Sequence, residues 1–132
     1  MTTYPTSAPR ILVAEDDASH QRIIDIVLRR ANYQATIVSN GLDALDAFLI
    51  SEYDLVLIDL AMPGMDGFEL LTRLKTQTAN RDVRFFALTV YLAETMKARC
   101  EAAGFHAYLS KPLKVQTLLT ALNASPSVST EA

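Results

Sequence analysis

The chain has 132 residues, half of them apolar, and a net charge of −3 at pH 7, which together predict one compact domain with a sizeable core. The mild negative charge and the absence of any basic run argue against nucleic acid as a direct partner. Cys100 is the single cysteine, no apolar stretch reaches membrane-spanning length and the first residues lack a signal-peptide core, so a reducing cytoplasm without membrane insertion is expected.

Short apolar runs alternate with helical patterns along the N-terminal half. Residues 1–9 are polar, contain two prolines and are predicted to form a flexible arm. Apolar and β-branched runs predict strands at 11–14, 33–38 and 55–58, and apolar residues at helical spacing predict a helix at 19–31. Asn40 is expected to cap a second helix. The residues of that helix predicted to face inward are Leu42, Leu45, Phe48 and Leu49.

The same alternation continues through the C-terminal half. Asp66 and Glu69 resemble a capping box before a third helix, and Gly104 is well placed to end a fourth helix in the left-handed conformation. Residues 124–132 are small and polar and predict a flexible tail, so the domain spans 10–123. The remaining predicted elements are strands at 83–88 and 106–109 and helices at 93–103 and from 115 onward.

Five strands that alternate with five helices predict a parallel sheet with right-handed crossovers. Helices on both faces of such a sheet give a three-layer α/β/α sandwich, a flavodoxin-like fold. In the strand order 2-1-3-4-5, the carboxyl ends of the first and third strands lie side by side. Glu15, Asp16 and Asp59 follow these two strands and are therefore expected to converge.

Three carboxylates at one site repel one another. Two unit charges about 4 Å apart cost roughly 4 kcal/mol at an effective dielectric of about 20, so either one carboxylate is protonated or a cation lies among them. Oxygen ligands at an open rim favour Mg²⁺. The fourth and fifth strands deliver Thr89 and Lys111 to the same rim. A hydroxyl, an ammonium, a metal and a carboxylate together indicate an aspartyl-phosphate site with Asp59 as the nucleophile.

Four stretches of the chain, in this order and spacing, resemble the CheY-like receiver domains of two-component response regulators. They are Ile11 to Asp17, Asp59 to Gly67, Leu88-Thr89 and Lys111-Pro112. The resemblance covers residues 10–123, and within the family residues 102–112 are most similar to receivers of hybrid histidine kinases. The start at Met1 and the polar tail favour a free-standing regulator over one domain of such a kinase.

The resemblance implies how phosphorylation proceeds. Asp59 accepts the phosphoryl group from the phosphohistidine of a histidine kinase or histidine phosphotransfer protein, in a self-catalysed reaction and not as a turnover enzyme. Asp16, Asp59 and the backbone carbonyl of Ala61 bind Mg²⁺, and Glu15 acts through a metal-bound water. Lys111 pairs with a phosphoryl oxygen.

The resemblance also implies how the domain responds. Thr89 hydrogen-bonds another phosphoryl oxygen after phosphorylation, and Tyr108 turns inward as Thr89 moves. The Lys111–Pro112 peptide bond is expected to be cis. Phosphorylation adds charge and acceptor oxygens and shifts the population between inactive and active states. The surface of the fourth helix, fifth strand and fifth helix then binds a downstream effector protein.

Three residues near the site are expected to modulate access to it. Val90 stands where receivers usually carry a smaller residue, and its methyl groups are expected to narrow the approach of small phosphodonors to Asp59. Ala61 and Tyr91 occupy the two variable positions that flank the site in receivers. Neither side chain easily positions an attacking water, which favours a long-lived phosphorylated state.

Other residues close to these motifs have simpler interpretations. Asp17 is expected to cap the first helix beside the acidic pair. His20 and His106 are expected to be ordinary surface or packing residues, because nothing in the sequence provides them with further metal ligands. Cys100 is expected to be a small buried or half-buried residue of the fourth helix.

Two further classes of function stand beside the receiver. An aspartyl phosphohydrolase on a similar sheet carries a second aspartate two residues after the nucleophile, where this chain has Ala61. A pseudo-receiver that only binds proteins lacks part of the site, whereas the carboxylates, the hydroxyl and the ammonium are all present here. Nucleotide binding is excluded because the chain has neither a Gly-x-Gly-x-x-Gly nor a Gly-Lys-Ser/Thr phosphate loop.

Overall fold

The fold is described from a computed structural model that covers residues 10–78, 82–90 and 93–123. The predicted arm at 1–9, the predicted tail at 124–132 and Tyr91 lie outside these residues. No helix in the described segments is long and apolar enough to cross a membrane. The elements are β1 (Arg10–Ala14), α1 (Ala18–Arg30), β2 (Gln34–Val38), α2 (Gly41–Ile50), β3 (Leu55–Asp59), α3 (Gly67–Lys75), β4 (Arg84–Thr89), α4 (Glu94–Ala103), β5 (Ala107–Ser110) and α5 (Val115–Asn123).

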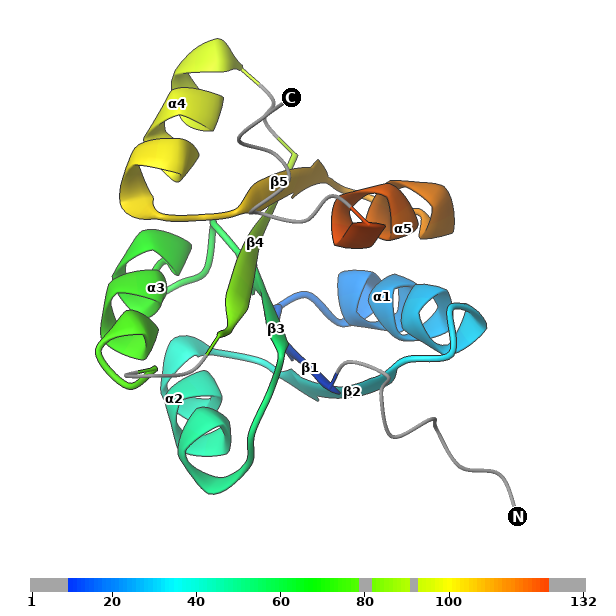
Figure 1. Cartoon of the computed structure of the whole chain (residues 1–132), viewed down its shortest axis with the longest axis horizontal. Coiled ribbons are helices and arrows are strands. Elements are labelled where there is room, and N and C mark those ends of the chain that lie inside the picture. The colour runs from blue at the N-terminus through cyan, green and yellow to red at the C-terminus, as the bar shows by residue number, and fades with distance from the viewer. Residues whose placement is uncertain (1–9, 79–81, 91–92, 124–132) are drawn as a thin grey trace.

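The five strands form one parallel sheet in the order β2-β1-β3-β4-β5, as predicted. Figure 1 shows three layers, with α2, α3 and α4 on one face of the sheet and α1 and α5 on the other. The predicted α/β/α sandwich is therefore confirmed. The register aligns the carboxyl ends of β1, β3 and β4, because Ala14 pairs with Ile58, and Asp59 pairs with Leu88.

Side chains of the central strands alternate between two hydrophobic clusters, one on each face. In β3, Val56 and Ile58 belong to the cluster under α2, α3 and α4, and Leu55 and Leu57 belong to the cluster under α1 and α5. All four of these side chains have no exposed surface. The uninterrupted apolar run before Asp59 is explained by this burial on both faces, which is typical of parallel sheets.

Three side chains cap the helices that begin at the carboxyl-terminal edge of the sheet, where the acidic residues lie. The carboxylates of Asp17 and Asp66 and the side-chain oxygen of Asn40 each accept a hydrogen bond from the backbone N–H three residues later, at 2.8 to 3.0 Å. Gly104 ends α4 with a φ of 109°, in the left-handed region. These caps agree with the sequence, although the observed ends of several elements differ from the predicted ones by a residue.

The prediction for the inner face of α2 was partly wrong. Leu42 and Leu49, which were expected to face inward, are 64% and 67% exposed. The buried residues are Gly41, Ala44 and Phe48, so the buried stripe is turned by one residue. Apolar residues occur on several sides of this helix, and a periodic pattern alone does not select one of them. Close approach to the segment between β3 and α3 favours a small residue, because a Cβ at position 41 would lie 2.7 Å from the sulfur of Met65.

Replacing Gly67 with alanine is expected to destabilise the domain by about 1–3 kcal/mol, the usual cost of overpacking. Gly67 is the first residue of α3, and a Cβ there would lie 2.8 Å from the carbonyl oxygen of Asp59 and 2.8 Å from Cα of Leu60. Both atoms belong to the backbone, so the strand end that carries Asp59 would have to shift. The free energy of unfolding in urea measures the effect.

Gly41→Ala is the matched control, because Gly41 is also the first residue of a helix that follows a side-chain cap. Its added methyl group would meet the flexible side chain of Met65 and not backbone. The control should therefore lose clearly less stability. Equal losses for Gly41→Ala and Gly67→Ala would contradict the explanation.

His106 joins the beginnings of β4 and β5. Nδ1 of His106 accepts a hydrogen bond from the backbone N–H of Phe85 at 3.0 Å. The backbone N–H of His106 donates to the Phe85 carbonyl at 2.8 Å. The imidazole also stacks on the Phe85 ring. Burial of the ring, together with the positive charge of Lys75, lowers the pKa of His106 from 6.5.

This lowered pKa predicts that the domain loses stability as the pH falls below 6.5. The unfolded chain then binds a proton that the folded state resists, because a protonated Nδ1 cannot accept the N–H of Phe85. Urea unfolding at about pH 7.5 and at about pH 5.5 measures the loss, and His106→Asn, whose side-chain oxygen replaces Nδ1 without titrating, should lose less between the two conditions. An identical loss in both proteins would show that His106 does not contribute.

Candidate functional site

The three carboxylates predicted to converge do meet at the carboxyl ends of β1 and β3. Glu15, Asp16 and Asp59 each offer an oxygen, and these oxygens all lie within 4.8 Å of one another. The order of the strands brings them together, because β1 and β3 are hydrogen-bonded neighbours. Asp59 therefore shares one site with two carboxylates that lie 43 and 44 positions earlier in the sequence.

The cluster is buried on one side and open on the other. Glu15 and Asp59 have 0% and 2% of their surface exposed, whereas Asp16 is exposed. Burying carboxylates is unfavourable unless a cation or hydrogen bonds compensate their charge. Asp16 is the member of the cluster that is accessible to solvent.

Both oxygens of Asp59 have a partner. Oδ1 accepts the backbone N–H of Ala61 at 3.0 Å, and Oδ2 lies 3.1 Å from the ammonium nitrogen of Lys111. Burial raises the pKa of Asp59, and the neighbouring charge of Glu15 adds to the increase, whereas the contacts with Ala61 and Lys111 oppose it. Because burial and the charge of Glu15 both disfavour the ionised form of Asp59, a bound cation would stabilise this carboxylate.

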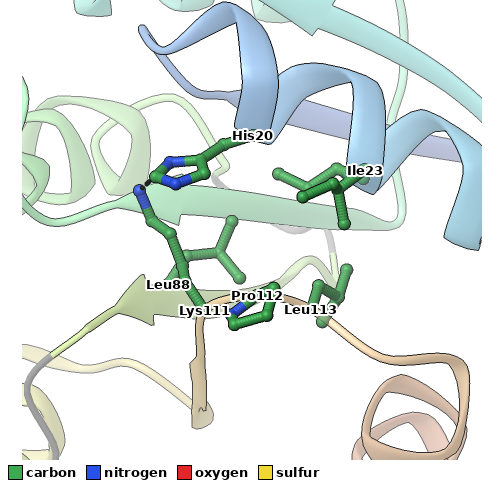
Figure 2. A pocket seen from close by; sticks show the side chains of 7 residues that line it. His20, Ile23, Leu88, Lys111, Pro112 and Leu113 are labelled. Carbon is green, nitrogen blue, oxygen red and sulfur yellow. Dashed lines mark hydrogen bonds between the residues drawn. The ribbon is translucent and has the colours of Figure 1, made fainter.

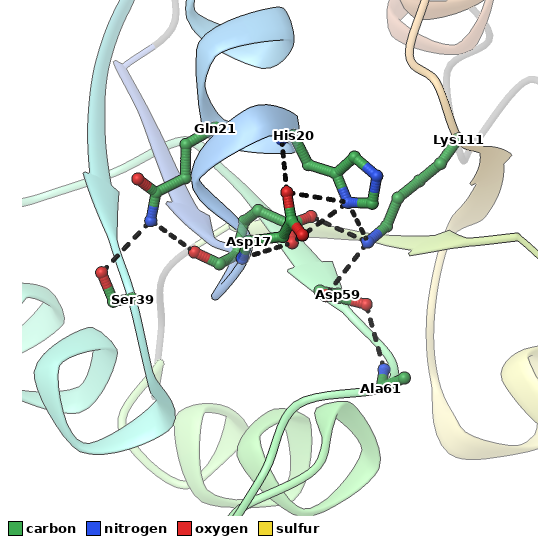
Figure 3. A network of polar contacts seen from close by, with 8 residues as sticks. Asp17, His20, Gln21, Ser39, Asp59, Ala61 and Lys111 are labelled. Atoms are coloured by element: carbon green, nitrogen blue, oxygen red, sulfur yellow. Dashed lines mark hydrogen bonds and ion pairs between the residues drawn. The ribbon is translucent and has the colours of Figure 1, made fainter.

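Glu15 is fixed at the end of β1 by its backbone and its side chain. Its N–H donates to the carbonyl of Val38, and its carbonyl accepts the side-chain amide of Gln21 at 2.6 Å. Of the carboxylate oxygens, Oε2 accepts the N–H of Asp17 at 3.1 Å and Oε1 lies 3.0 Å from Nζ of Lys111. Figure 3 shows this network running from Gln21 at the start of α1 to Lys111 and Asp59.

Lys111 supplies the positive charge between the two buried carboxylates. It follows β5, its N–H donates to the carbonyl of Thr89, and its side chain is only 8% exposed. Burial works to lower the pKa of Lys111, but its hydrogen bonds to Glu15 and Asp59 outweigh burial and raise the pKa. The lysine is therefore charged at neutral pH, and the Lys111–Pro112 bond beside it is cis, as the resemblance implied.

His20 belongs to this site and is not the ordinary surface or packing residue that was expected. Its Nδ1 lies 3.1 Å from Nζ of Lys111 and 3.5 Å from Oε2 of Glu15. The available signal was its place in the first turn of α1, whose start lies beside the acidic pair. A sequence does not reveal which way the side chain of that turn points, and the pairing with Lys111 spans 91 residues.

The other residues predicted for the site that the structure describes belong to β5, to the last residue of β4 and to the residue after it. Thr89 ends β4 and is 5% exposed, and Val90 after it is 59% exposed. Tyr108 in β5 is half-buried against the hydrophobic cluster under α2, α3 and α4. Nζ of Lys97 lies 5.8 Å from the centre of its ring. Cys100 is buried in α4, as expected, and burial raises the pKa of its thiol.

The donor set fits a hard divalent cation. It contains three carboxylates and one ammonium, so the site keeps negative charge, and it offers only oxygen ligands, which Mg²⁺ and Ca²⁺ prefer. A cation between Asp16 and the two buried carboxylates would compensate charge that Lys111 alone leaves unbalanced. The site is therefore a candidate metal site.

An α/β sandwich with this cluster of carboxylates and a lysine at the ends of its central strands has the parts needed for metal-assisted phosphoryl transfer to a carboxylate. The chain belongs to the response regulator receiver domain family, which its residues 11–123 match. Receiver domains take phosphoryl groups from histidine kinases or phosphotransfer proteins, and the chain is accordingly a phosphoacceptor domain of two-component signalling.

The relatives of the chain differ in how much of their length it covers. The chain is 35% identical over 117 residues to the sensory/regulatory protein RpfC of Xanthomonas campestris, which covers 86% of the chain but only 16% of RpfC. It is 31% identical over 113 residues to sporulation initiation phosphotransferase F of Bacillus subtilis, with 86% of the chain and 90% of the relative covered. The chain thus spans a small part of one relative and nearly all of another.

Solved structures agree with this family. The receiver domain of the sensor histidine kinase PA1611 from Pseudomonas aeruginosa, solved with a magnesium ion coordinated in its active site cleft, is 30% identical with a TM-score of 0.80. That comparison covers 92% of this chain and 99% of the other. The chemotaxis protein CheY4 of Vibrio cholerae is 26% identical with a TM-score of 0.80, over 88% of this chain and 97% of the other.

Proposed function

We propose that Asp59 is the phosphoacceptor and that it reacts with a phosphohistidine of a histidine kinase or histidine phosphotransfer protein. The observation that carries the proposal is the surrounding of Asp59, a carboxylate that is 2% exposed, lies 3.1 Å from the ammonium of Lys111 and shares a cluster with Glu15 and Asp16. Asp16, Asp59 and the carbonyl of Ala61 would hold Mg²⁺, with Glu15 acting through a water. When bound, the ion neutralises charge on the entering phosphoryl group.

In the proposed reaction, a carboxylate oxygen of Asp59 forms a bond to phosphorus and the bond between phosphorus and the donor imidazole breaks. The imidazole nitrogen keeps the electron pair of that bond, and the ring leaves as a neutral imidazole because its other nitrogen carries a proton. Lys111, already within reach of Asp59, pairs with a phosphoryl oxygen. Thr89, at the end of the neighbouring strand β4, donates its hydroxyl to another oxygen.

The phosphorylated domain would act by binding, and not as a turnover enzyme. The movement of Thr89 towards the phosphoryl group leaves room for Tyr108, which is half-buried on the next strand, to turn inward. The surface formed by α4, β5 and α5 then recognises a downstream effector protein. Because the new charge stabilises one of two states, the response is a shift in their populations.

Replacing Val90 with alanine is expected to speed phosphorylation by a small donor such as acetyl phosphate several-fold. Val90 follows the last residue of β4 and is 59% exposed, so its methyl groups stand at the rim and not in the core. Removing them widens the approach to Asp59 without creating a cavity. The initial rate of phosphorylation measures the effect, and equal rates for the two proteins would contradict it.

A phosphotransfer profile tests the proposed function. The chain is incubated with Mg²⁺ and with each phosphorylated histidine kinase and histidine phosphotransfer protein of its host, and transfer of labelled phosphate is followed over time. Transfer from one donor much faster than from the others would identify its partner, and Asp59→Asn is the control that should take no label. The absence of label with every donor would favour the pseudo-receiver, and label on Asp59→Asn would place the acceptor elsewhere.

A further inference from the structure

The ammonium of Lys111 has three acceptors at hydrogen-bonding distance. Its Nζ lies 3.0 Å from Oε1 of Glu15, 3.1 Å from Oδ2 of Asp59 and 3.1 Å from Nδ1 of His20. A lysine ammonium carries three N–H donors and no acceptor. The contacts with the two carboxylates are ion pairs, and the contact with Nδ1 of His20 is a hydrogen bond, in which the ammonium can only donate. Nδ1 of His20 must offer its lone pair, so the imidazole is neutral with its proton on Nε2.

His20 is held in this place by the start of α1. Its backbone N–H donates to the carboxylate of Asp17 at 3.0 Å, which fixes the turn from which the imidazole projects. Figure 2 shows the ring facing the end of the Lys111 side chain, with Ile23 and Leu113 lining the space next to the pair. That space has a volume of about 10 Å³, which a single water would fill.

We infer that His20 is a positioning residue, which holds the Lys111 ammonium over Asp59 as an uncharged third acceptor. The inference rests on the proposed role of Asp59 as the phosphoacceptor. A long lysine side chain has many rotamers, and a third contact restricts it to the one that meets an incoming phosphoryl group. A carboxylate in place of the imidazole would also hold the lysine, but it would add a fourth negative charge to the cluster that must accept a phosphoryl group.

Substituting His20 with asparagine or leucine tests whether its side chain positions the Lys111 ammonium or only fills the space beside it. The side-chain oxygen of asparagine branches from Cγ as Nδ1 of histidine does, so His20→Asn keeps an acceptor close to Lys111. Leucine has the same number of side-chain heavy atoms as asparagine, branched at the same carbon, but no acceptor. The two variants therefore differ mainly in the hydrogen bond to the ammonium.

The experiment measures phosphorylation of the full chain by phosphoramidate in the presence of Mg²⁺, for the wild type, His20→Asn, His20→Leu and Asp59→Asn. We expect His20→Leu to react about tenfold more slowly than the wild type, because it loses a hydrogen bond to a charged group, and His20→Asn to react within about threefold of it. Nitrogen NMR of the wild-type imidazole should show a proton on Nε2 and a bare Nδ1 whose resonance moves in Lys111→Met.

A wild-type rate for His20→Leu, a rate for His20→Asn as low as that of His20→Leu, or a proton on Nδ1 would each overturn the inference. The NMR result does not depend on the stability of the His20 variants, so it decides the question even if one of them folds poorly. Label on Asp59→Asn would instead overturn the proposed function. If Asp59→Asn takes no label while His20→Leu reacts at the wild-type rate, only the role of His20 fails.

Discussion

Asp59→Asn is expected to abolish phosphorylation by every donor while making the metal-free domain more stable. The amide oxygen cannot replace the carboxylate as the nucleophile, so no label should appear. Stability should rise because the pKa of Asp59 is raised, chiefly by burial and also by the charge of Glu15, which means that the ionised group destabilises the fold relative to a neutral one. Urea unfolding at neutral pH in the presence of a chelator measures this gain.

The same pair of proteins also tests the metal site. A cation that binds only the folded state stabilises it by about 2.7 kcal/mol at a hundred times its dissociation constant. Mg²⁺ should therefore raise the unfolding midpoint of the wild type and raise that of Asp59→Asn much less, because one of three carboxylates is lost. An equal response to Mg²⁺ in both proteins would mean that Asp59 is not a ligand, and a lower metal-free stability of Asp59→Asn would mean that its contact with Lys111 outweighs burial.

Lys111→Met is expected to lower the free energy of unfolding by about 3–5 kcal/mol without divalent cations, the usual cost of removing one partner of a buried ion pair. The side chain of Lys111 is 8% exposed and lies within 3.1 Å of both Glu15 and Asp59, which would be left as two buried carboxylates without a cation. Mg²⁺ should recover more stability in this variant than in the wild type, since the ion then supplies the missing positive charge. Urea unfolding with and without Mg²⁺ measures both effects.

Lys114→Met is the matched control, because Lys114 is exposed and lies three residues further along the chain. It should change stability by less than about 0.5 kcal/mol, as is usual for substitutions at the surface. Phosphorylation should also be slowed in Lys111→Met alone, because only this lysine reaches the acceptor. A small loss of stability in Lys111→Met, equal to that of the control, would show that the buried carboxylates do not depend on the ammonium.

The local features that could be predicted from the sequence are those set by a few neighbouring residues. The apolar run at 55–58 predicted a doubly buried strand, and the structure buries all four side chains. Asp17, Asn40 and Asp66 predicted helix starts, and each caps one. Such features follow from hydrogen-bonding capacity and hydrophobic period within one turn or one strand, so they do not depend on distant parts of the chain.

The inner face of α2 could not be predicted in this way. Leu42 and Leu49 have the spacing of a buried stripe, yet both are exposed, because α2 turns its small residues Gly41 and Ala44 inward instead. The choice depends on the side chain of Met65, which packs closely against position 41 and favours a residue without a side chain there. Packing against a distant segment of the chain therefore decided which face of α2 is buried, because the helical period allowed more than one.

The chemical groups of the site could be predicted without the structure, because the alternation of strands and helices places five of them at strand ends on one edge of a parallel sheet. These residues are Glu15, Asp16, Asp59, Thr89 and Lys111. The pairing of these groups is visible only in the folded structure. The contacts of Lys111 with Glu15, Asp59 and His20 depend on side-chain directions and on distances across 52 to 96 residues of chain, which no local pattern encodes. For that reason the carboxylates and the lysine could be predicted, whereas the histidine that contacts the lysine could not.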